Sequence, residues 1–421
     1  MGGGFKIKTT FSTFNILNIG MLTIYLILFT MTFLNIELGK YLLTMVFAYN
    51  IFLLYKFKRQ QTFLILLLFA STYWFYMFFY FYFGIPYSSY LNMQTLENTV
   101  AVLRIQSLFF ILLFNLINIH TNVELASTIQ RKENPVIFYC CLVIMLVIAL
   151  FVLGGETIFE MAYGEGTTRT SLLEYYFIFS LLAYVFSVSK NKSKLIFAIN
   201  MFYALKLILV GLRLVAIEVI VLNFLLFYEN QLKTKWIILI SSIISVLLTA
   251  LSFVRVGYYS SFKEMVGFSD QGVLITNQGD VFLASVVHYG MVANEYFDLS
   301  FRLKSFIGFW LNIFLPPEYQ IQEAILNHNV YPYIVGGGGF SGVYAYVWLN
   351  YIGIFLLALY ISYFINRAYN NKKSTIYATF IIFTFFRWYP YSLIILFKMG
   401  LWLWIIYISC LLLHQTLKKT G

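Results

Sequence analysis

Five cationic side chains that flank apolar runs could bind a phosphorylated ligand. They are Arg213, Arg255, Arg302, Arg387 and Lys398. A guanidinium presents a fixed fork of N–H donors that matches phosphate oxygens, and it keeps its charge at physiological pH. Cations grouped beside aromatic residues at one face of a membrane would suit a lipid-linked diphosphate. The alternative is that these residues anchor the chain to lipid headgroups, as Arg, Trp and Tyr commonly do.

A second set of residues could accept a proton or let a ligand approach closely. His328 precedes four consecutive glycines. These are Gly336, Gly337, Gly338 and Gly339. A neutral imidazole suits a general base near pH 7, and Glu323 is the competing candidate. Glycines leave backbone N–H groups open to an anion or a sugar. A histidine hydrogen-bonded within its loop and a flexible glycine hinge are the alternatives.

Two further ionisable residues, Lys206 and Glu218, lie inside or at the edge of apolar runs, as Arg213 does. Each such group costs about 2.5 to 3.5 kcal/mol in the apolar part of a membrane, so each is a candidate for function. Lys206 could instead extend its ammonium to the headgroups. Arg213 and Glu218 could form a purely structural pair.

No metal ion or other cofactor is expected. Cys140, Cys141 and Cys410 lie inside apolar runs and lack metal-ligand spacing. The aspartates of residues 255–340 are isolated from one another, and no Asp-x-Asp pair or His/Glu triplet occurs there. Metal-dependent transfer of a lipid-linked sugar is therefore disfavoured.

The elements that must position these residues are expected to lie in a membrane. Of the 421 residues, 61% are hydrophobic and 11% are charged, whereas soluble globular chains are about one quarter charged. A soluble fold of this size could not bury so much apolar surface. The net charge of +11 would suggest nucleic acid in a soluble chain but indicates membrane topology here. We expect no nucleic-acid partner.

The apolar runs predict an all-α fold, a polytopic transmembrane helical bundle of about 12 spans, because one spanning helix needs about 17 to 25 apolar residues. Continuous apolar runs favour helices over a transmembrane barrel. The predicted spans are residues 14–34, 38–55, 62–83, 101–119, 136–153, 172–188, 195–210, 212–228, 236–254, 341–364, 375–394 and 397–414.

Lysines and arginines concentrate in alternate breaks between these spans, which predicts that those breaks and both termini are cytoplasmic. The whole chain, residues 1–421, is expected to form a single membrane domain. Its largest break, residues 255–340, is predicted to face outward. Within that loop, residues 281–297 and 306–315 are expected to form short helices near the membrane surface, since they are too short to span it.

The chain resembles the Wzy-type O-antigen polymerases. The resemblance rests on Gly-x-Arg at residues 211–213, the large late outer loop, His328 with the glycines that follow it, and Arg-x-x-Pro-Tyr at residues 387–391. It implies a metal-independent glycosyltransferase of the membrane-embedded C type in the bacterial inner membrane. It also implies transfer of a growing glycan from one undecaprenyl diphosphate onto another undecaprenyl-diphosphate-linked repeat unit at the periplasmic face.

The residues assigned to this reaction are Arg213, Arg255 and Arg387 as the clamp of the diphosphate, and His328 as the base. Membrane lipids, a chain-length regulator and a flippase would be further partners. Two other functions remain open at this stage. An O-antigen ligase would share the chemistry and differ in its acceptor. A lipid-linked oligosaccharide flippase would need cations deep in the bundle and little mass outside it.

Overall fold

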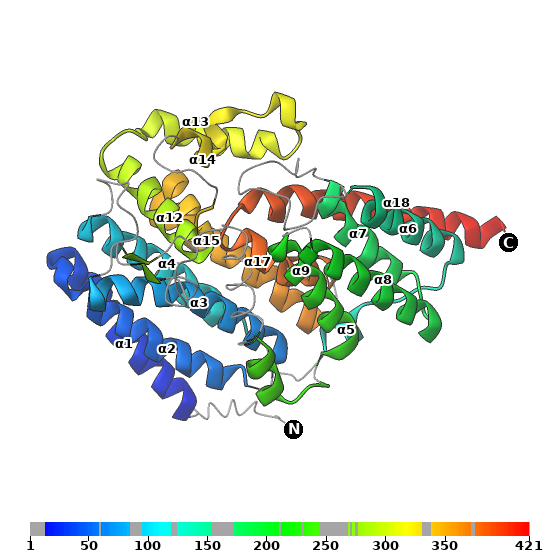
Figure 1. Ribbon diagram of the computed structural model, residues 1–421, viewed down its shortest axis with the longest axis horizontal. Helices are drawn as coiled ribbons and strands as arrows, with labels where there is room; N and C mark the ends of the chain where they lie inside the picture. Colours follow the sequence, from blue (N-terminus) through cyan, green and yellow to red (C-terminus); the bar gives the residue numbers. More distant parts are fainter. Residues whose placement is uncertain are drawn as a thin grey trace, which may run out of the picture.

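The computed structural model is helical almost throughout (Figure 1). It describes residues 13–58, 60–84, 95–118, 124–152, 172–209, 212–229, 231–241, 243, 268–269, 272–273, 277–330, 338–371 and 375–420. Within these ranges the only strands are β1 (Phe268–Ser269) and β2 (Gly272–Val273), which pair antiparallel. The expectation of an all-α fold is therefore confirmed for the described residues.

Two groups of helices flank a central group. The first group packs α1 on α2 and α2 on both α3 and α4. Its bounds are α1 (Thr13–Leu34), η1 (Ile36–Leu38), α2 (Gly39–Lys56), α3 (Gln61–Phe83) and α4 (Leu96–Leu116). The second group comprises α6 (Pro135–Val147), η2 (Ile148–Val152), α7 (Leu172–Val185), α8 (Lys190–Leu209), α9 (Arg213–Asn223) and η3 (Phe224–Tyr228). The four-residue helix α5 (Leu125–Thr128) lies between the two groups in the sequence.

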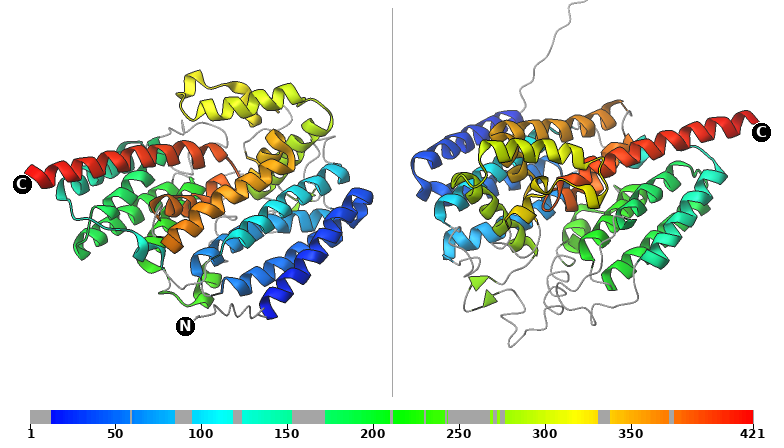
Figure 2. Two further views of the ribbon diagram at one scale, coloured as in Figure 1. Left: turned by 180° about the vertical axis from the view of Figure 1, so that it is seen from behind. Right: turned by 90° about the horizontal axis from the view of Figure 1, so that it is seen from above.

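The C-terminal helices connect the two groups. α15 (Ser341–Asn371) packs along α4, while α16 (Thr375–Phe383) and α17 (Phe385–Trp388) pack on α9. The π-helical turn η6 (Ile395–Met399) then leads into α18 (Gly400–Thr420), which runs outward to the C-terminus (Figure 2). Residues from both flanking groups therefore meet at the central helices.

The segment of residues 277–330 first enters the bundle and then forms a separate layer over one end of the central helices. It contains α12 (Asn277–Ala293), α13 (Leu299–Asn312), η4 (Pro317–Tyr319), η5 (Gln322–Ala324) and α14 (Leu326–Asn329). α12 packs on α3, α4 and α15, and α13 lies across the bundle at the top of the view (Figure 1). Two helices were expected here, but each begins earlier in the chain than residues 281 and 306.

Side-chain caps explain several helix ends. Thr95 accepts a hydrogen bond from the backbone N–H of Asn98 at the start of α4. Asp298 does the same for Phe301 at the start of α13. Such caps satisfy N–H groups that have no partner inside the helix. Gly84, with φ of 62°, ends α3 in the left-handed conformation that glycine adopts without strain.

Six helices in the described ranges are long and apolar enough to cross a membrane. They cover 15–34, 36–56, 61–83, 96–116, 341–369 and 395–419. Four shorter apolar helices cover 135–150, 173–185, 214–228 and 281–293. Six of the twelve predicted spans therefore match full-length helices. Most of the predicted span 236–254 lies outside the described residues, and the predicted span 375–394 is divided between α16 and α17.

One long helix is broken inside the bundle. In α15, Leu349 and Asn350 have non-helical backbone angles, and Asn350 has a positive φ of 53°. Arg302 of α13 reaches this break, where it donates to the backbone carbonyls of Val347 and Tyr346 and to the side chain of Asn350. A break frees carbonyls from the helical ladder, so the arginine satisfies groups that would otherwise lack donors.

Candidate functional site

Two segments that the sequence singles out lie side by side in the structure. The N–H of Gly339 donates to the Pro390 carbonyl at 2.9 Å, and the N–H of Ser341 donates to the Tyr389 carbonyl at 3.0 Å. The Ser341 hydroxyl also donates to the Trp388 carbonyl. The glycine segment before α15 and the Arg-x-x-Pro-Tyr segment, which begins inside α17, therefore form one junction.

Glycine is required at this junction because side chains fill the space beside it. A Cβ atom on Gly338 would lie 2.9 Å from Cδ1 of Tyr391 and 3.0 Å from Cγ2 of Val281. A Cβ atom on Gly339 would lie 2.7 Å from the hydroxyl of Tyr344. Both glycines are thus explained by close packing. Gly336 and Gly337 lie outside the described residues.

Arg387 lies at the same junction, next to two carboxylates. Its Nη2 is 3.8 Å from Oε1 of Glu174 on α7. Its charge also interacts with Glu218, which is on α9 and only 2% exposed. Among the described residues, Nε of Arg387 and Oε1 of Glu218 have no hydrogen-bond partner. We call Arg387, Glu174 and Glu218 the Arg387 cluster.

A polar network holds the helices that carry this cluster. Asn200 of α8 accepts hydrogen bonds from the hydroxyls of Tyr176 at 2.8 Å and Ser180 at 3.0 Å, both on α7. Asn200 also donates to Asn223 of α9 at 2.7 Å. The ring of Tyr203 stacks on that of Tyr176 with 3.8 Å between centroids. Buried networks of this kind fix helices in one register, so Glu174 and Glu218 are placed firmly.

The predicted clamp is only partly described. Arg213 is the first residue of α9, and α9 packs on α17, which carries Arg387. The helices that carry Arg213 and Arg387 are therefore neighbours. The side chain of Arg213 and the whole of Arg255 lie outside the described part of the chain.

Three other candidate cations are held by backbone carbonyls. Arg302 binds the break in α15, as described above. Lys398 donates to the carbonyls of Leu315 at 2.6 Å and Asn312 at 3.3 Å, which neutralises the C-terminal end of α13. Lys206 donates to the carbonyl of Ala149 at 2.9 Å. Each of these cations links two segments of the chain, so it has fewer N–H donors left for a phosphate.

The two candidate bases belong to the layer above the bundle. Glu323 is exposed in η5. His328 is in α14, and its side chain lies outside the described part. The neighbouring Asn327 is 3.0 Å from the hydroxyl of Tyr344 and, through its amide nitrogen, 3.2 Å from Nε2 of His288. This contact ties α14 to both α12 and α15, above the junction.

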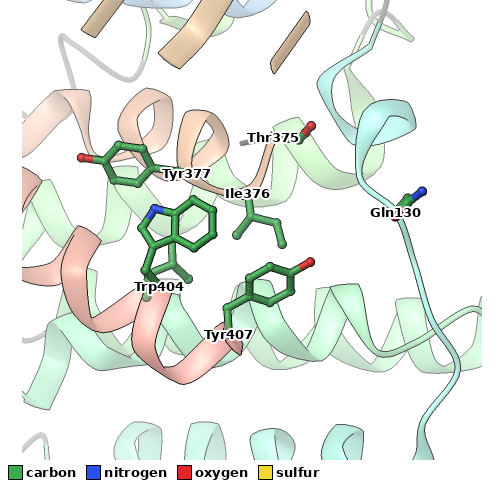
Figure 3. Close-up of a pocket in the computed structure, with 7 residues that line it drawn as sticks. Gln130, Thr375, Ile376, Tyr377, Trp404 and Tyr407 are labelled. Carbon is green, nitrogen blue, oxygen red and sulfur yellow. The ribbon is translucent and has the colours of Figure 1, made fainter. Parts of the chain in front are cut away.

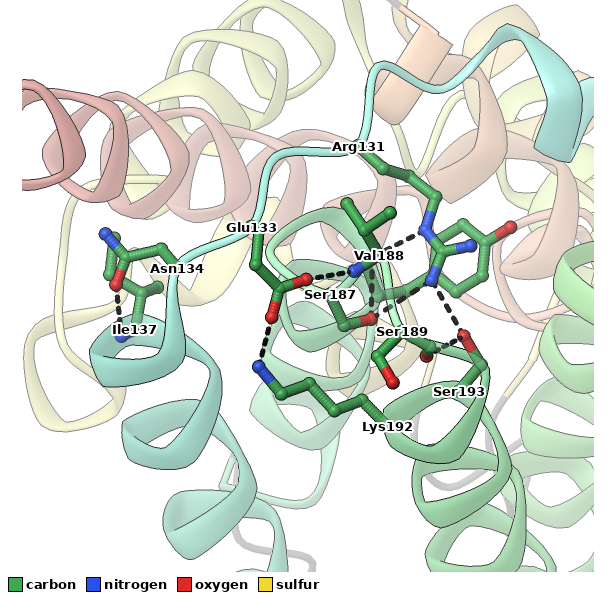
Figure 4. Close-up of polar contacts among 10 residues, drawn as sticks. Arg131, Glu133, Asn134, Ile137, Ser187, Val188, Ser189, Lys192 and Ser193 are labelled. Carbon is green, nitrogen blue, oxygen red and sulfur yellow. Dashed lines mark hydrogen bonds and ion pairs between the residues drawn. The ribbon is translucent and has the colours of Figure 1, made fainter. Parts of the chain in front are cut away.

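A second charged group lies at the other end of α7 (Figure 4). Arg131 donates to the hydroxyls of Ser193 at 2.7 Å and Ser187 at 3.3 Å, and its guanidinium lies 4.4 Å from the ring centroid of Tyr184. Glu133 pairs with Lys192 beside it. We call these the Arg131 cluster. It fixes the segment before α6 against the start of α8.

A small pocket of about 80 Å³ opens near the start of α16 (Figure 3). Gln130, Thr375, Ile376, Tyr377, Leu403, Trp404 and Tyr407 line it. Thr375 begins α16, whereas Arg387 follows the other end of that helix. The pocket holds none of the predicted site residues.

The sequence did not single out Glu174 or Arg104 as site residues. Glu174 follows a polar stretch and carries no motif, so only the fold reveals its pairing with Arg387. Arg104 could have been found, because it is an arginine within an apolar run of α4.

No group of three possible metal ligands occurs among the described residues. No protein-family model, curated protein or solved structure matches the chain.

Proposed function

We propose that this protein is a polysaccharide polymerase of the O-antigen type. It transfers a growing glycan from undecaprenyl diphosphate onto the sugar of another undecaprenyl-diphosphate-linked repeat unit. The observation that carries the proposal is the Arg387 cluster. A cation lies between apolar helices there, with one guanidinium nitrogen unpartnered among the described residues and with the side chain 16% exposed. The Nε of Arg387 can therefore donate to an anion without breaking an existing hydrogen bond.

The proposed reaction replaces one bond to the donor sugar with another. The bond between its anomeric carbon and the diphosphate oxygen breaks, and the electron pair leaves with the diphosphate. The acceptor hydroxyl forms the new bond and gives its proton to a base. Arg387, together with Arg213 and Arg255, stabilises the negative charge of the leaving diphosphate. This electrostatic stabilisation is strongest where water is excluded. Glu174 and Glu218 hold the guanidinium in position while no substrate is bound.

His328 is the proposed base, and Glu323 is its competitor. Both belong to the layer that covers the junction, so an acceptor sugar bound between that layer and Arg387 would meet them from above. Glu174 is a third carboxylate to test because it lies beside Arg387 itself. A base must come within hydrogen-bond reach of the acceptor hydroxyl, so substitution of the true base should lower the rate of transfer without abolishing donor binding.

We also propose about 12 spans, with both termini in the cytoplasm and residues 255–340 at the periplasmic face of a bacterial inner membrane. The six long apolar helices and the four shorter ones support a polytopic chain. Fusions of alkaline phosphatase and of a fluorescent protein to successive breaks test the topology. A phosphatase active after residue 229 but inactive after residue 330 would reverse the proposed orientation.

The direct experiment is polymer formation by the purified protein in proteoliposomes supplied only with lipid-linked repeat units. The wild type is expected to produce a ladder of long chains, and Arg387→Ala to lose most of that activity. Arg131→Ala is the matched control, because it removes a cation from the opposite end of α7. Equal ladders from all three proteins would refute the assignment of Arg387.

Gel analysis of a deletion strain separates this function from the two alternatives. A polymerase leaves a single repeat unit attached to the lipid A core. Loss of all attachment would instead indicate a ligase. Repeat units that never reach the periplasm would indicate a flippase.

A further inference from the structure

A second arginine is buried in the bundle without an acidic partner. Arg104 of α4 is 6% exposed, and its Nε has no hydrogen-bond partner among the described residues. Its guanidinium lies 3.8 Å from the ring centroid of Phe33 at the end of α1. No ion pair of Arg104 occurs within the described ranges. Burial of a cation without an anion is costly, so Arg104 is a candidate for binding an anionic ligand.

The ring of Phe33 lies 6.4 Å from that of Tyr351, centroid to centroid, and Tyr351 belongs to a row of three tyrosines. The charge of Arg104 interacts with the hydroxyls of Tyr289 on α12 and of Tyr346 and Tyr351 on α15. The rings form a continuous wall, with 5.8 Å between the centroids of Tyr289 and Tyr346 and 5.2 Å between those of Tyr346 and Tyr351. None of the three hydroxyls donates a hydrogen bond to another described residue. The group therefore offers one cation and three free O–H donors, which suit an anion with several oxygens.

The break in α15 makes this group possible. Tyr346 and Tyr351 lie on either side of Leu349 and Asn350, where the helix departs from regular geometry. Arg302 binds the freed carbonyls and the Asn350 side chain, so it holds the two tyrosines in this arrangement. The charge of Arg302 also interacts with the Tyr346 hydroxyl. A costly backbone conformation is thus maintained beside an unpaired arginine, which is a common feature of ligand sites.

Apolar surface borders the group. Leu34, next to Phe33, is 88% exposed, and Ile352, next to Tyr351, is 67% exposed. In a membrane such surface faces lipid chains. A ligand whose anionic head meets Arg104 could therefore lay an apolar tail on α1 and α15 without entering water.

We infer that Arg104, Tyr289, Tyr346 and Tyr351 bind the diphosphate head of a second polyprenyl-linked glycan, the acceptor of the reaction. This inference rests on the proposed function, since a polymerase must hold two lipid diphosphates at once. Arg387 serves the donor beside α7 and α9, whereas Arg104 belongs to the group α1–α4. The two head groups would thus bind to different helix groups on either side of the reacting sugars.

The test measures how many molecules of sugar-free undecaprenyl diphosphate bind to the purified full-length protein, by native mass spectrometry in detergent micelles. Wild type is expected to bind two. Arg104→Gln and Arg387→Gln should each bind one, and the double variant none. Tyr351→Phe keeps the ring and removes one donor, so it should weaken one of the two sites about tenfold. Arg131→Gln is the control that should still bind two.

The inference would be overturned if Arg104→Gln still bound two molecules of undecaprenyl diphosphate and Tyr351→Phe kept the wild-type affinity. It would also be overturned if wild type bound only one molecule. Competition identifies the ligand. Displacement from the Arg104 site by phosphatidylglycerol, or by inorganic diphosphate at equal concentration, would show a headgroup or free-anion site instead. Polymer formation is measured separately. If the Arg104 site binds undecaprenyl diphosphate but the protein makes no polymer, the proposed function is refuted and the binding site is not.

Discussion

The two ends of α7 carry clusters built around an arginine, and the clusters differ in how completely the arginine is bonded. Arg131 at one end is held by two serine hydroxyls, the Tyr184 carbonyl and the Tyr184 ring. Arg387 at the other end has a carboxylate at 3.8 Å and an unpartnered Nε within the described residues. The Arg131 cluster therefore has a structural role, whereas Arg387 can still donate a hydrogen bond to another partner.

This difference has a physical basis. Buried polar atoms nearly always find partners, because each unsatisfied one costs about 1 to 3 kcal/mol. Glu218, which interacts electrostatically with Arg387, also leaves Oε1 unpartnered among the described residues, so the cluster holds two open polar atoms. Open atoms at one end of α7 and bonded atoms at the other indicate that the Arg387 cluster is the one suited to a ligand.

The largest effect is expected from Arg387→Ala. Loss of a preorganised cation at the leaving diphosphate should reduce the rate of polymer formation about 100-fold to 1000-fold. The variant should also be less stable, by about 3 kcal/mol, because it leaves two carboxylates among apolar helices. Adding Glu174→Gln should restore part of the stability, as followed by thermal unfolding in detergent micelles, but none of the rate. Recovery of the rate in this double variant would indicate a structural role for Arg387.

A smaller effect is expected from Arg131→Ala. It removes charge-assisted hydrogen bonds to Ser187 and Ser193, which should lower the free energy of unfolding by about 1.5 to 3 kcal/mol. The rate per folded molecule should stay at the wild-type value, because the reaction takes place at the far end of α7. A large fall in rate without loss of stability would contradict the comparison.

The junction between the glycine segment and α17 should be sensitive to added volume. Gly339→Ala places a Cβ atom within 2.7 Å of the Tyr344 hydroxyl, and overpacking of this kind costs about 1 to 3 kcal/mol. Gly20→Ala is the matched control, because nothing lies within 4 Å of a Cβ atom there. Thermal unfolding of both variants measures the difference, and equal melting temperatures would show that the junction is not tightly packed.

The smallest effect concerns Glu133 and Lys192 in the Arg131 cluster. Two hydrogen bonds lower the pKa of the Glu133 carboxyl below its ordinary value of 4.5. The larger contribution comes from Lys192 and the smaller one from the Val188 N–H. A lowered pKa adds stability above pH 4.5, which disappears as the pH falls through the folded-state pKa. The Glu133 side chain is 42% exposed to solvent, so the gain is about 0.2 to 1 kcal/mol. Wild type and Glu133→Gln should therefore differ at pH 7 and converge at low pH.

Long apolar runs predicted the helices well. The expected span 62–83 corresponds to α3 (Gln61–Phe83), because a continuous apolar run of that length can satisfy its backbone only as a helix. The break in α15 was not predicted from residues 341–364. Neither a proline nor a glycine stands at Leu349 or Asn350, and the arginine that binds the break comes from α13.

The site was predicted in part. The glycine segment and the Arg387 segment were both singled out, but their pairing depends on hydrogen bonds between distant parts of the chain. Arg302 and Lys398 were candidates for the diphosphate, and the structure shows that they donate to carbonyls of α15 and to that of Leu315 after α13. Sequence reveals a cation and its neighbours in the chain, but it does not reveal which carbonyls a fold leaves open.

The most direct test of Arg387 as the diphosphate ligand is the rate at which proteoliposomes release undecaprenyl diphosphate from lipid-linked repeat units. Arg387→Lys and Arg131→Lys each keep the positive charge and remove the guanidinium fork. We predict that Arg387→Lys loses most of the rate and that Arg131→Lys keeps the wild-type rate. Release at the wild-type rate by Arg387→Lys, or an equal loss in both variants, would contradict the account.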